Sequence, residues 1–275
     1  MCVFFVFCEN LVLISKGSGN IKNKIKTIIG IILLLAGIGI INYELITVGS
    51  EVKNSEKIVN DFVIVSDSTT ASDKIIDSNK ADTNKKDKNS DTEINWSKLL
   101  KTNKDVVAWI EIPNTNINYP VLKGKSNDTY LRTNIYKNHS FSGSIFVSED
   151  NDKPFNDFNT IIYGHNLENG QMFSQLKKYK SQDFYQKHSI IYMHLPNGST
   201  EEYKIVSFHE VNDADDDVYN LNCKNYSDYK QGVNKNNKLR SVYSFDDSSV
   251  KNVITLSTCT NRGTNKRYVL HAVKL

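Results

Sequence analysis

Three polar residues at the borders of apolar, β-rich segments could together support nucleophilic catalysis. Cys259 follows the apolar run Val253–Leu256, and His165 follows a second β-rich run, Thr160–Tyr163. A cysteine thiolate is a strong nucleophile, and a nearby imidazole can move the protons that acyl transfer requires. Arg267, eight residues after the cysteine, is a cation that could stabilise a developing oxyanion.

Each of these residues also has an ordinary structural explanation. A lone cysteine is more often a small buried hydrophobe than a nucleophile, and a histidine in a loop is usually solvated. Arg267 lies in a basic stretch that also contains Arg262 and Lys266. Cys223 is the other cysteine of the globular part, so counting alone allows a disulfide. The residue types by themselves leave a reactive thiol, an inert thiol and a disulfide open for Cys259.

The elements that must position these residues are mostly strands. Short apolar runs between turn residues predict strands at 106–112, 117–122, 144–149, 159–164, 189–195, 201–211, 250–257 and 267–275. Helical spacing predicts helices at 94–103, 171–186 and 225–239. Many short strands at hairpin spacing, with few helices, predict a mostly β fold, a closed or nearly closed antiparallel barrel.

The chain before this globular part contains an apolar segment and a polar one. An uninterrupted apolar run at 28–41, with lysines before it and acids after it, predicts a transmembrane signal anchor at 27–48. Residues 1–26 would then be cytoplasmic, and a buried core helix is the alternative. Residues 49–93, rich in Asp, Lys, Asn and Ser, predict a disordered extracellular stalk, which leaves 94–275 as the globular domain.

Composition argues against several other kinds of site. A net charge of +3 over 275 residues gives no footprint for nucleic acid. Two well-separated cysteines without a CxxC pair do not make a zinc site. The acidic run Asp213–Asp217 resembles a calcium loop only superficially, because Val218 replaces the turn glycine and Lys224 stands where the bidentate acid belongs. We expect no metal, cofactor or nucleic-acid partner.

Taken together, the motifs resemble the sortase family, and class B sortases in particular, over residues 94–275. The motifs occur in the order His, Cys, Arg: Tyr163-Gly164-His165-Asn166, Thr255-Leu256-Ser257-Thr258-Cys259 and Arg267-Tyr268-Val269. The segments 103–110 and 117–121 and a long insertion at about 212–245 are similar to class B. Ala108 stands where the family usually has glycine.

This resemblance implies a sortase-like β-barrel and a membrane-anchored cysteine transpeptidase of the Gram-positive cell wall, with cysteine-peptidase chemistry. Such an enzyme cleaves the sorting signal of secreted surface proteins after Thr, holds the acyl part as a thioester and joins it to a peptidoglycan amine. It implies Cys259 as nucleophile, His165 as acid and base, and Arg267 with the backbone N–H of Thr260 as oxyanion donors. The substrate contacts that it implies are Asn127, Leu131, Tyr219 and Ser257.

Other classes agree less well with the motifs. A cysteine protease would end the same thioester with water, but the caspase-like Q-A-C-x-G sequence is absent, and papain-like enzymes place Cys before His. The Ser-His-Gly-Cys sequence of L,D-transpeptidases is also missing. A non-enzymatic adhesin would share the anchor, the stalk and the β-domain. It has no reason to place His and Cys at two strand ends.

Overall fold

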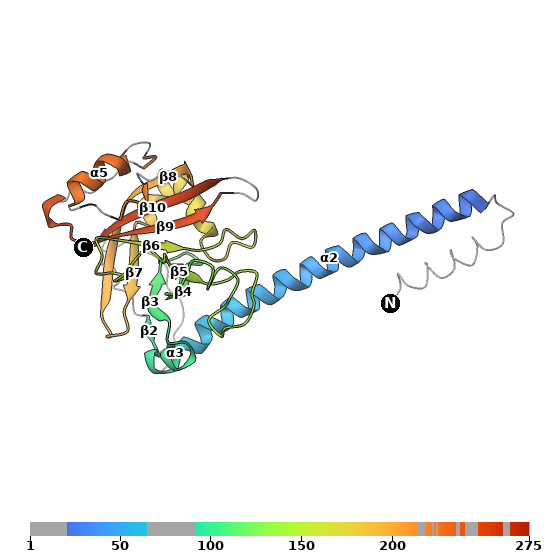
Figure 1. Cartoon of the computed structure of the whole chain (residues 1–275), viewed down its shortest axis with the longest axis horizontal. Coiled ribbons are helices and arrows are strands. Elements are labelled where there is room, and N and C mark those ends of the chain that lie inside the picture. The colour runs from blue at the N-terminus through green and yellow to red at the C-terminus, as the bar shows by residue number, and fades with distance from the viewer. Residues whose placement is uncertain are drawn as a thin grey trace, which may run out of the picture. The chain divides into compact units, whose positions relative to one another are not determined.

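The protein divides into two compact units, residues 1–50 and 51–275. The structure, a computed structural model, describes residues 21–64, 92–213, 218–221, 223, 225–234, 237–239, 247–260 and 265–274. Figure 1 shows a barrel of strands and a long N-terminal helix, α2 (Ile21–Phe62).

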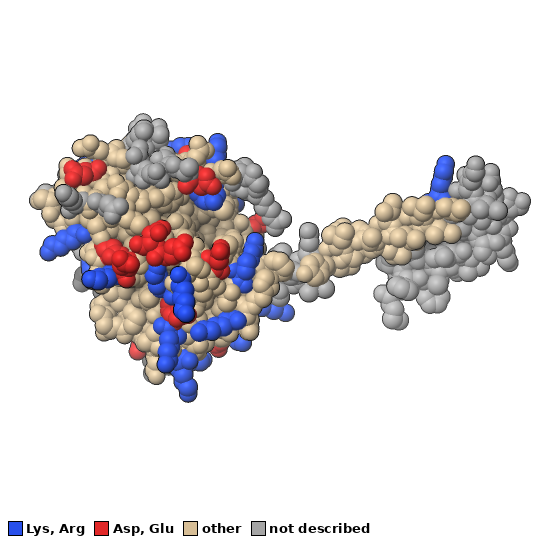
Figure 2. All heavy atoms as spheres, viewed as in Figure 1, with Lys and Arg blue, Asp and Glu red and all other residues tan. Residues whose placement is uncertain are grey.

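Helix α2 carries the apolar segment predicted from the sequence. Its stretch Ile25–Tyr43 has 19 residues and a mean hydropathy of 2.2, which is long and apolar enough to cross a membrane. No residue of this stretch is buried, and all except Ile31 and Gly37 are exposed. Figure 2 shows most of the stretch in tan, the colour of residues other than Lys, Arg, Asp and Glu. A buried core helix would show the opposite pattern, so this helix suggests membrane anchoring.

The last turns of α2 belong to the barrel unit. Ile58 and Phe62 lie one helical turn apart and are 6% and 1% exposed, within a hydrophobic cluster of the barrel. The carboxylate of Asp61 accepts a hydrogen bond of 2.7 Å from the Tyr136 hydroxyl. Because apolar residues at i and i+4 share one helix face, a mostly polar segment can still pack along a single stripe.

A short two-stranded sheet follows this helix. β1 (Val63–Ile64) pairs antiparallel with β2 (Glu93–Ile94). The expectation of a disordered stalk over 49–93 is therefore wrong for residues 49–64, which are helix and strand, and at its far end for 93. The middle of that segment, 65–91, lies outside the described residues.

Eight strands close into a barrel in the order β10-β8-β7-β3-β4-β5-β6-β9. They are β3 (Val106–Glu111), β4 (Asn118–Leu122), β5 (Ile145–Val147), β6 (Asn159–Tyr163), β7 (Ile190–His194), β8 (Thr200–Asn212), β9 (Val253–Cys259) and β10 (Lys266–Lys274). The predicted closed barrel is confirmed, with one difference. The pairs β4–β5 and β6–β9 are parallel, and the remaining neighbours are antiparallel.

Short helices connect the strands: α3 (Trp96–Thr102), η1 (Ser174–Lys180), α4 (Gln182–Lys187), α5 (Tyr226–Asn234) and η3 (Asp247–Ser249). The helix predicted over 171–186 is split. Ser181 has an extended backbone with ψ 125°, and its side chain accepts a hydrogen bond from the backbone N–H of Phe184. Serine in this conformation caps the start of α4 and so separates it from η1.

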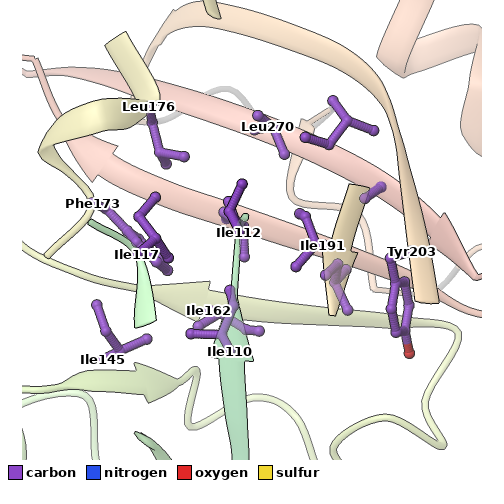
Figure 3. Close-up of a cluster of buried hydrophobic side chains, with 14 of the residues drawn as sticks. Ile110, Ile112, Ile117, Ile145, Ile162, Phe173, Leu176, Ile191, Tyr203 and Leu270 are labelled. Atoms are coloured by element: carbon purple, nitrogen blue, oxygen red, sulfur yellow. The ribbon is translucent and has the colours of Figure 1, made fainter. Parts of the chain in front are cut away.

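The barrel interior is filled by branched aliphatic side chains from facing strands. Figure 3 shows Ile110, Ile162 and Leu270 among the residues that point toward one another there. The outer face of β9 is also buried, because Tyr226, Tyr229 and Val233 of α5 pack over its first residue, Val253. A strand covered on both faces is a rigid support for whatever stands at its end.

Candidate active site

His165 and Cys259 come together because β6 and β9 run parallel. Tyr163 is the register partner of Ser257, and the backbone N–H of Gly164 donates to the Ser257 carbonyl at 3.2 Å. His165 and Cys259 each lie two residues beyond that pair. A parallel pair places both C-terminal ends at the same edge, whereas an antiparallel pair would have separated them.

Arg267 completes the group from the other side. β10 pairs antiparallel with β9, and Arg267 is the register partner of Cys259. Since β10 begins where β9 ends, the guanidinium and the thiol arise from adjacent backbone positions. We call His165, Cys259 and Arg267 the strand-end triad. The sequence predicted these three residues as catalytic, and the barrel topology brings them to one edge.

Cys259 is exposed, and it is the one exposed residue of β9. Both Cys259 and Cys223 are free thiols. Two of the alternatives left open by the sequence, a buried inert thiol and a disulfide, therefore do not hold. An exposed thiol at the end of a strand is accessible to a substrate carbonyl.

His165 is held by its own loop. Its carbonyl oxygen accepts a hydrogen bond from the backbone N–H of Phe173 at 3.0 Å, which closes the loop between β6 and η1. A Cβ on Gly164 would collide with the side chains of Ile145 and Phe173. The φ of Gly164 is not positive, so glycine is required here for close packing and not for a left-handed turn.

The imidazole of His165 also has a defined protonation pattern. Its Nε2 lies 2.8 Å from the carbonyl oxygen of Leu131, and a carbonyl oxygen only accepts, so Nε2 carries the proton. In the neutral ring, Nδ1 is then the nitrogen that can accept another proton. Burial lowers the pKa of His165 below 6.5; the bond to Leu131 opposes this shift, and the charge of Arg132 adds to it.

Arg267 is partly exposed, at 27% of its side chain, and its charge is partly balanced. Its Nη2 lies 3.5 Å from Oδ2 of Asp213, and its Nη1 donates to the Lys266 carbonyl at 3.2 Å. The carboxylate is itself 39% exposed, so this ion pair is weak. The guanidinium can exchange this contact for one with a substrate oxygen at little cost.

The structure modifies the expectation for Thr260. Its backbone N–H, predicted as an oxyanion donor, donates to the carbonyl oxygen of Lys266 at 3.0 Å, and the residue is 4% exposed. That donor would reach a substrate only after this bond opens. A residue not predicted from the sequence, Asn166, donates from Nδ2 to the Thr260 carbonyl at 2.8 Å. Its position directly after His165 was the available signal.

Two predicted substrate contacts lie on the connection between β4 and β5. Leu131 is 38% exposed, and its carbonyl oxygen contacts the triad through His165. Among the residues described, the Asn127 side chain forms its hydrogen bonds with Glu149 and not with the triad. Its Nδ2 donates to Oε1 of Glu149 at 3.0 Å, and its Oδ1 accepts from the Glu149 backbone N–H at 2.9 Å. Leu131 is thus placed at the site directly, and Asn127 braces the segment after β5.

The other two predicted contacts, Tyr219 and Ser257, lie together. The Tyr219 hydroxyl and the Ser257 hydroxyl are 2.8 Å apart, and Ser257 is two residues before Cys259 on the same face of β9. Tyr219 is partly exposed, whereas Ser257 is 1% exposed. Much of the insertion that carries Tyr219 lies outside the described residues, including 214–217 of the acidic run. Among the side chains that the structure does describe, no group of three His, Cys, Asp or Glu could hold a metal.

A closed barrel with an accessible thiol between an imidazole and a guanidinium has the features of an enzyme that performs acyl transfer on cysteine. The sortase domain model matches residues 110–275. The chain belongs to the sortase family. Within that family it is of class B, a sortase B cysteine transpeptidase, as its relatives show.

Two curated relatives are named sortase B. The chain is 35% identical to that of Staphylococcus aureus (strain NCTC 8325 / PS 47) over 181 residues, which is 64% of this chain and 73% of the relative. It is 33% identical to that of Listeria monocytogenes serovar 1/2a (strain ATCC BAA-679 / EGD-e) over 249 residues, 86% of this chain and 92% of the relative.

Solved structures agree with this assignment. The S. aureus sortase B–substrate complex superposes with a TM-score of 0.59 at 32% identity, covering 66% of this chain and 84% of the other. Clostridium perfringens sortase B gives a TM-score of 0.60 at 32% identity, covering 65% of this chain and 98% of the other. Sortase B has also been solved in complex with triglycine, with a TM-score of 0.59 at 32% identity, 66% of this chain and 85% of that one.

Proposed function

We propose that this sortase cleaves a C-terminal sorting signal of secreted surface proteins after Thr and joins the new carboxyl group to a peptidoglycan amine. The observation that carries the proposal is the exposed thiol of Cys259, with Arg267 opposite it in the ladder and His165 at the end of the parallel strand. The sortase B complexes with a substrate and with triglycine support a peptide donor and an amine acceptor.

The first half of the reaction forms a thioester. The Cys259 sulfur attacks the carbonyl carbon of the Thr residue, and Nδ1 of His165 accepts the thiol proton. Arg267 stabilises the oxyanion of the tetrahedral intermediate. When that intermediate collapses, the C–N bond breaks, the imidazolium gives its proton to the departing amine, and the acyl group stays on sulfur.

The second half returns the enzyme to its starting state. The wall amine attacks the thioester carbonyl and loses a proton to His165, while Arg267 again faces the oxyanion. The C–S bond breaks, a new amide forms, and the thiolate recovers its proton. Leu131 and Tyr219 would contact the peptide on the way in, because they lie beside the strand-end triad and are at least partly exposed. Ser257, which is 1% exposed, would act through its bond to Tyr219.

The test is a panel of quenched sorting peptides incubated with the enzyme, with and without an amine such as triglycine. We expect cleavage after Thr and, when the amine is present, a product that contains both peptides. A product ending only in a free carboxylate would favour the runner-up, a cysteine protease that uses water. No cleavage of any sorting peptide would contradict the proposal.

We propose a single-pass membrane location with the N-terminus in the cytoplasm and the barrel outside. The lysines before α2's apolar stretch and the acidic residues after it support this orientation. Protease added to wall-free cells should remove the barrel domain. A fully protected domain would contradict the orientation.

A further inference from the structure

Three consecutive residues of the insertion are each bonded to a different strand of the barrel. The carbonyl oxygen of Val218 lies 2.8 Å from Nε2 of His271 on β10, and the carbonyl oxygen of Asn220 accepts from Nδ2 of Asn159 on β6 at 3.1 Å. Between them, the hydroxyl of Tyr219 meets Ser257 on β9. The backbone on both sides of Tyr219 is thus attached to the wall of the barrel.

His271 is built as a fixed donor. It is 0% exposed; its Nε2 faces a carbonyl and must carry the proton, so Nδ1 accepts from the Ser207 hydroxyl at 2.7 Å. Burial, with His209 nearby, lowers the pKa of His271 to about 3, while its bond to Val218 opposes the shift. The ring is therefore neutral at physiological pH, with both nitrogens in use.

Asn159 is fixed in the same way. It is 0% exposed, and its Oδ1 accepts a hydrogen bond of 2.8 Å from the Thr255 hydroxyl. This contact sets the orientation of the amide, so that Nδ2 is the atom directed at Asn220. The oxygen and the nitrogen of this buried amide thus each have a hydrogen-bond partner, and leaving either one without a partner would be costly.

The contacts of Tyr219 bear on the peptide site because they cover the outer face of β9 as far as the residue before Cys259 on that face. On the outer face of β9, Thr255 is covered by Tyr229 of α5 through a 3.1 Å hydroxyl contact, and Ser257 is covered by Tyr219. Cys259, the next residue on that face, is exposed. Burial raises the pKa of Tyr219, and the bond to Ser257 and the nearby charge of Arg267 oppose that rise. Ser257, covered by Tyr219, is therefore the last covered position of this face before the nucleophile.

We propose that His271 and Asn159 are positioning residues that clamp Val218–Asn220 and, through Tyr219, set the affinity of the enzyme for its peptide substrate. The inference rests on the proposed function, since it assigns Tyr219 to peptide binding. Neither residue touches the substrate. Their effect belongs in KM, while kcat and the reactivity of Cys259 depend on the strand-end triad.

His271→Asn and His271→Gln form a matched pair for the test. Both variants carry the same amide, but only the longer glutamine can place an N–H where Nε2 of histidine was. His209→Leu is a control, because that ring is 0% exposed and lies 5.2 Å from the His271 ring, yet neither of its nitrogens has a hydrogen-bond partner among the residues described.

In the full-length enzyme, His271→Asn should raise KM for a sorting peptide about three- to tenfold, the range expected for losing one buried hydrogen bond. Its kcat and the rate of Cys259 alkylation by iodoacetamide should match wild type. His271→Gln and His209→Leu should keep KM within about twofold of wild type. Chymotrypsin should cleave after Tyr219 faster in His271→Asn alone, a readout that needs no catalytic activity.

Equal KM values for His271→Asn and wild type would overturn the proposal, as would a His271→Gln or His209→Leu variant as impaired as His271→Asn. If wild type cleaves no sorting peptide, the proposed function fails. The chymotrypsin pattern then decides the clamp separately, and unchanged cleavage after Tyr219 in His271→Asn overturns it.

Discussion

The site draws on two regions that reach their positions in different ways. The strand-end triad lies at the edge of the barrel, where the ladder sets the places of Cys259 and Arg267 and the short loop after β6 holds His165. Leu131 and Tyr219 lie on connections, where individual hydrogen bonds to His165 and Ser257 set their places. A residue of the first kind moves only with the barrel, and one of the second kind can move alone.

This difference predicts how the reaction divides between the regions. Changes in the triad should lower kcat, because they alter groups that act on the reacting atoms. Changes in the connections should raise KM and leave kcat nearly unchanged, because they alter the contact with peptide. Each of the following predictions would sharpen or break that division.

The largest effect is expected for Cys259→Ala. No other group in the strand can form a thioester, so cleavage of a sorting peptide should become undetectable in a fluorescence assay. Cys223→Ala is the control, since Cys223 is the other described free thiol and lies in the insertion. A folded Cys259→Ala protein that still cleaves the peptide would refute the assignment.

His165→Ala should lower kcat by about 10²–10⁴, the usual contribution of a positioned acid–base group. His139→Ala is the matched control, because His139 is exposed and outside the triad, and its kcat should match wild type. Steady-state kinetics with both variants measures the ratio. A kcat within a few-fold of wild type for His165→Ala would remove His165 from the triad.

Arg267→Lys should lower kcat about tenfold to a hundredfold while the thermal unfolding midpoint stays near wild type. Lysine keeps the positive charge but lacks the planar guanidinium, whose fixed N–H groups can be directed at an oxyanion. Because the ion pair with Asp213 is exposed, its loss should cost little stability. Full activity of this variant would show that charge alone suffices.

Tyr219→Phe should raise KM about two- to fivefold with kcat unchanged, since it removes one hydroxyl contact. Ser257→Ala removes the partner of that contact and should act similarly. The double variant should be no worse than either single one, because both changes break the same bond. A fall in kcat with constant KM would break the division between the two regions.

The smallest effect concerns pH. Burial, assisted by the charge of Arg132, holds the pKa of His165 below 6.5. Because the neutral imidazole is the base, kcat/KM of the wild type should fall with acidification only below pH 6.5. Arg132→Gln removes a charge that disfavours the imidazolium, and the limb should move to higher pH. Lys137→Gln, at an exposed lysine of the same connection, should leave the limb in place.

The sequence allowed the strands and the barrel to be predicted, because apolar alternation is a local feature, and it marked His165, Cys259 and Arg267 as candidates at the borders of strands. The parallel pairing of β6 and β9 is not local. Without that pairing, the sequence does not show that His165 and Cys259 lie close together, and only the resemblance to sortases placed them in one site.

Other differences between the prediction and the structure come from contacts between residues that are far apart in the sequence. Residues 51–62 were predicted as part of a stalk from their polar composition, but Ile58 and Phe62 form a narrow apolar stripe that packs on the barrel. The Thr260 N–H is occupied by Lys266 across a hairpin. The clamp at His271 depends on an insertion far from it in sequence, so a buried histidine in a strand gave no sign of it.

The most direct test of the central claim is intact-protein mass spectrometry of the enzyme mixed with a sorting peptide and no amine. The account predicts a mass increase equal to the peptide fragment that ends in Thr, located by digestion to Cys259 and released by hydroxylamine. Attachment at another residue, or turnover with no adduct on Cys259 even after rapid acid quenching, would contradict it.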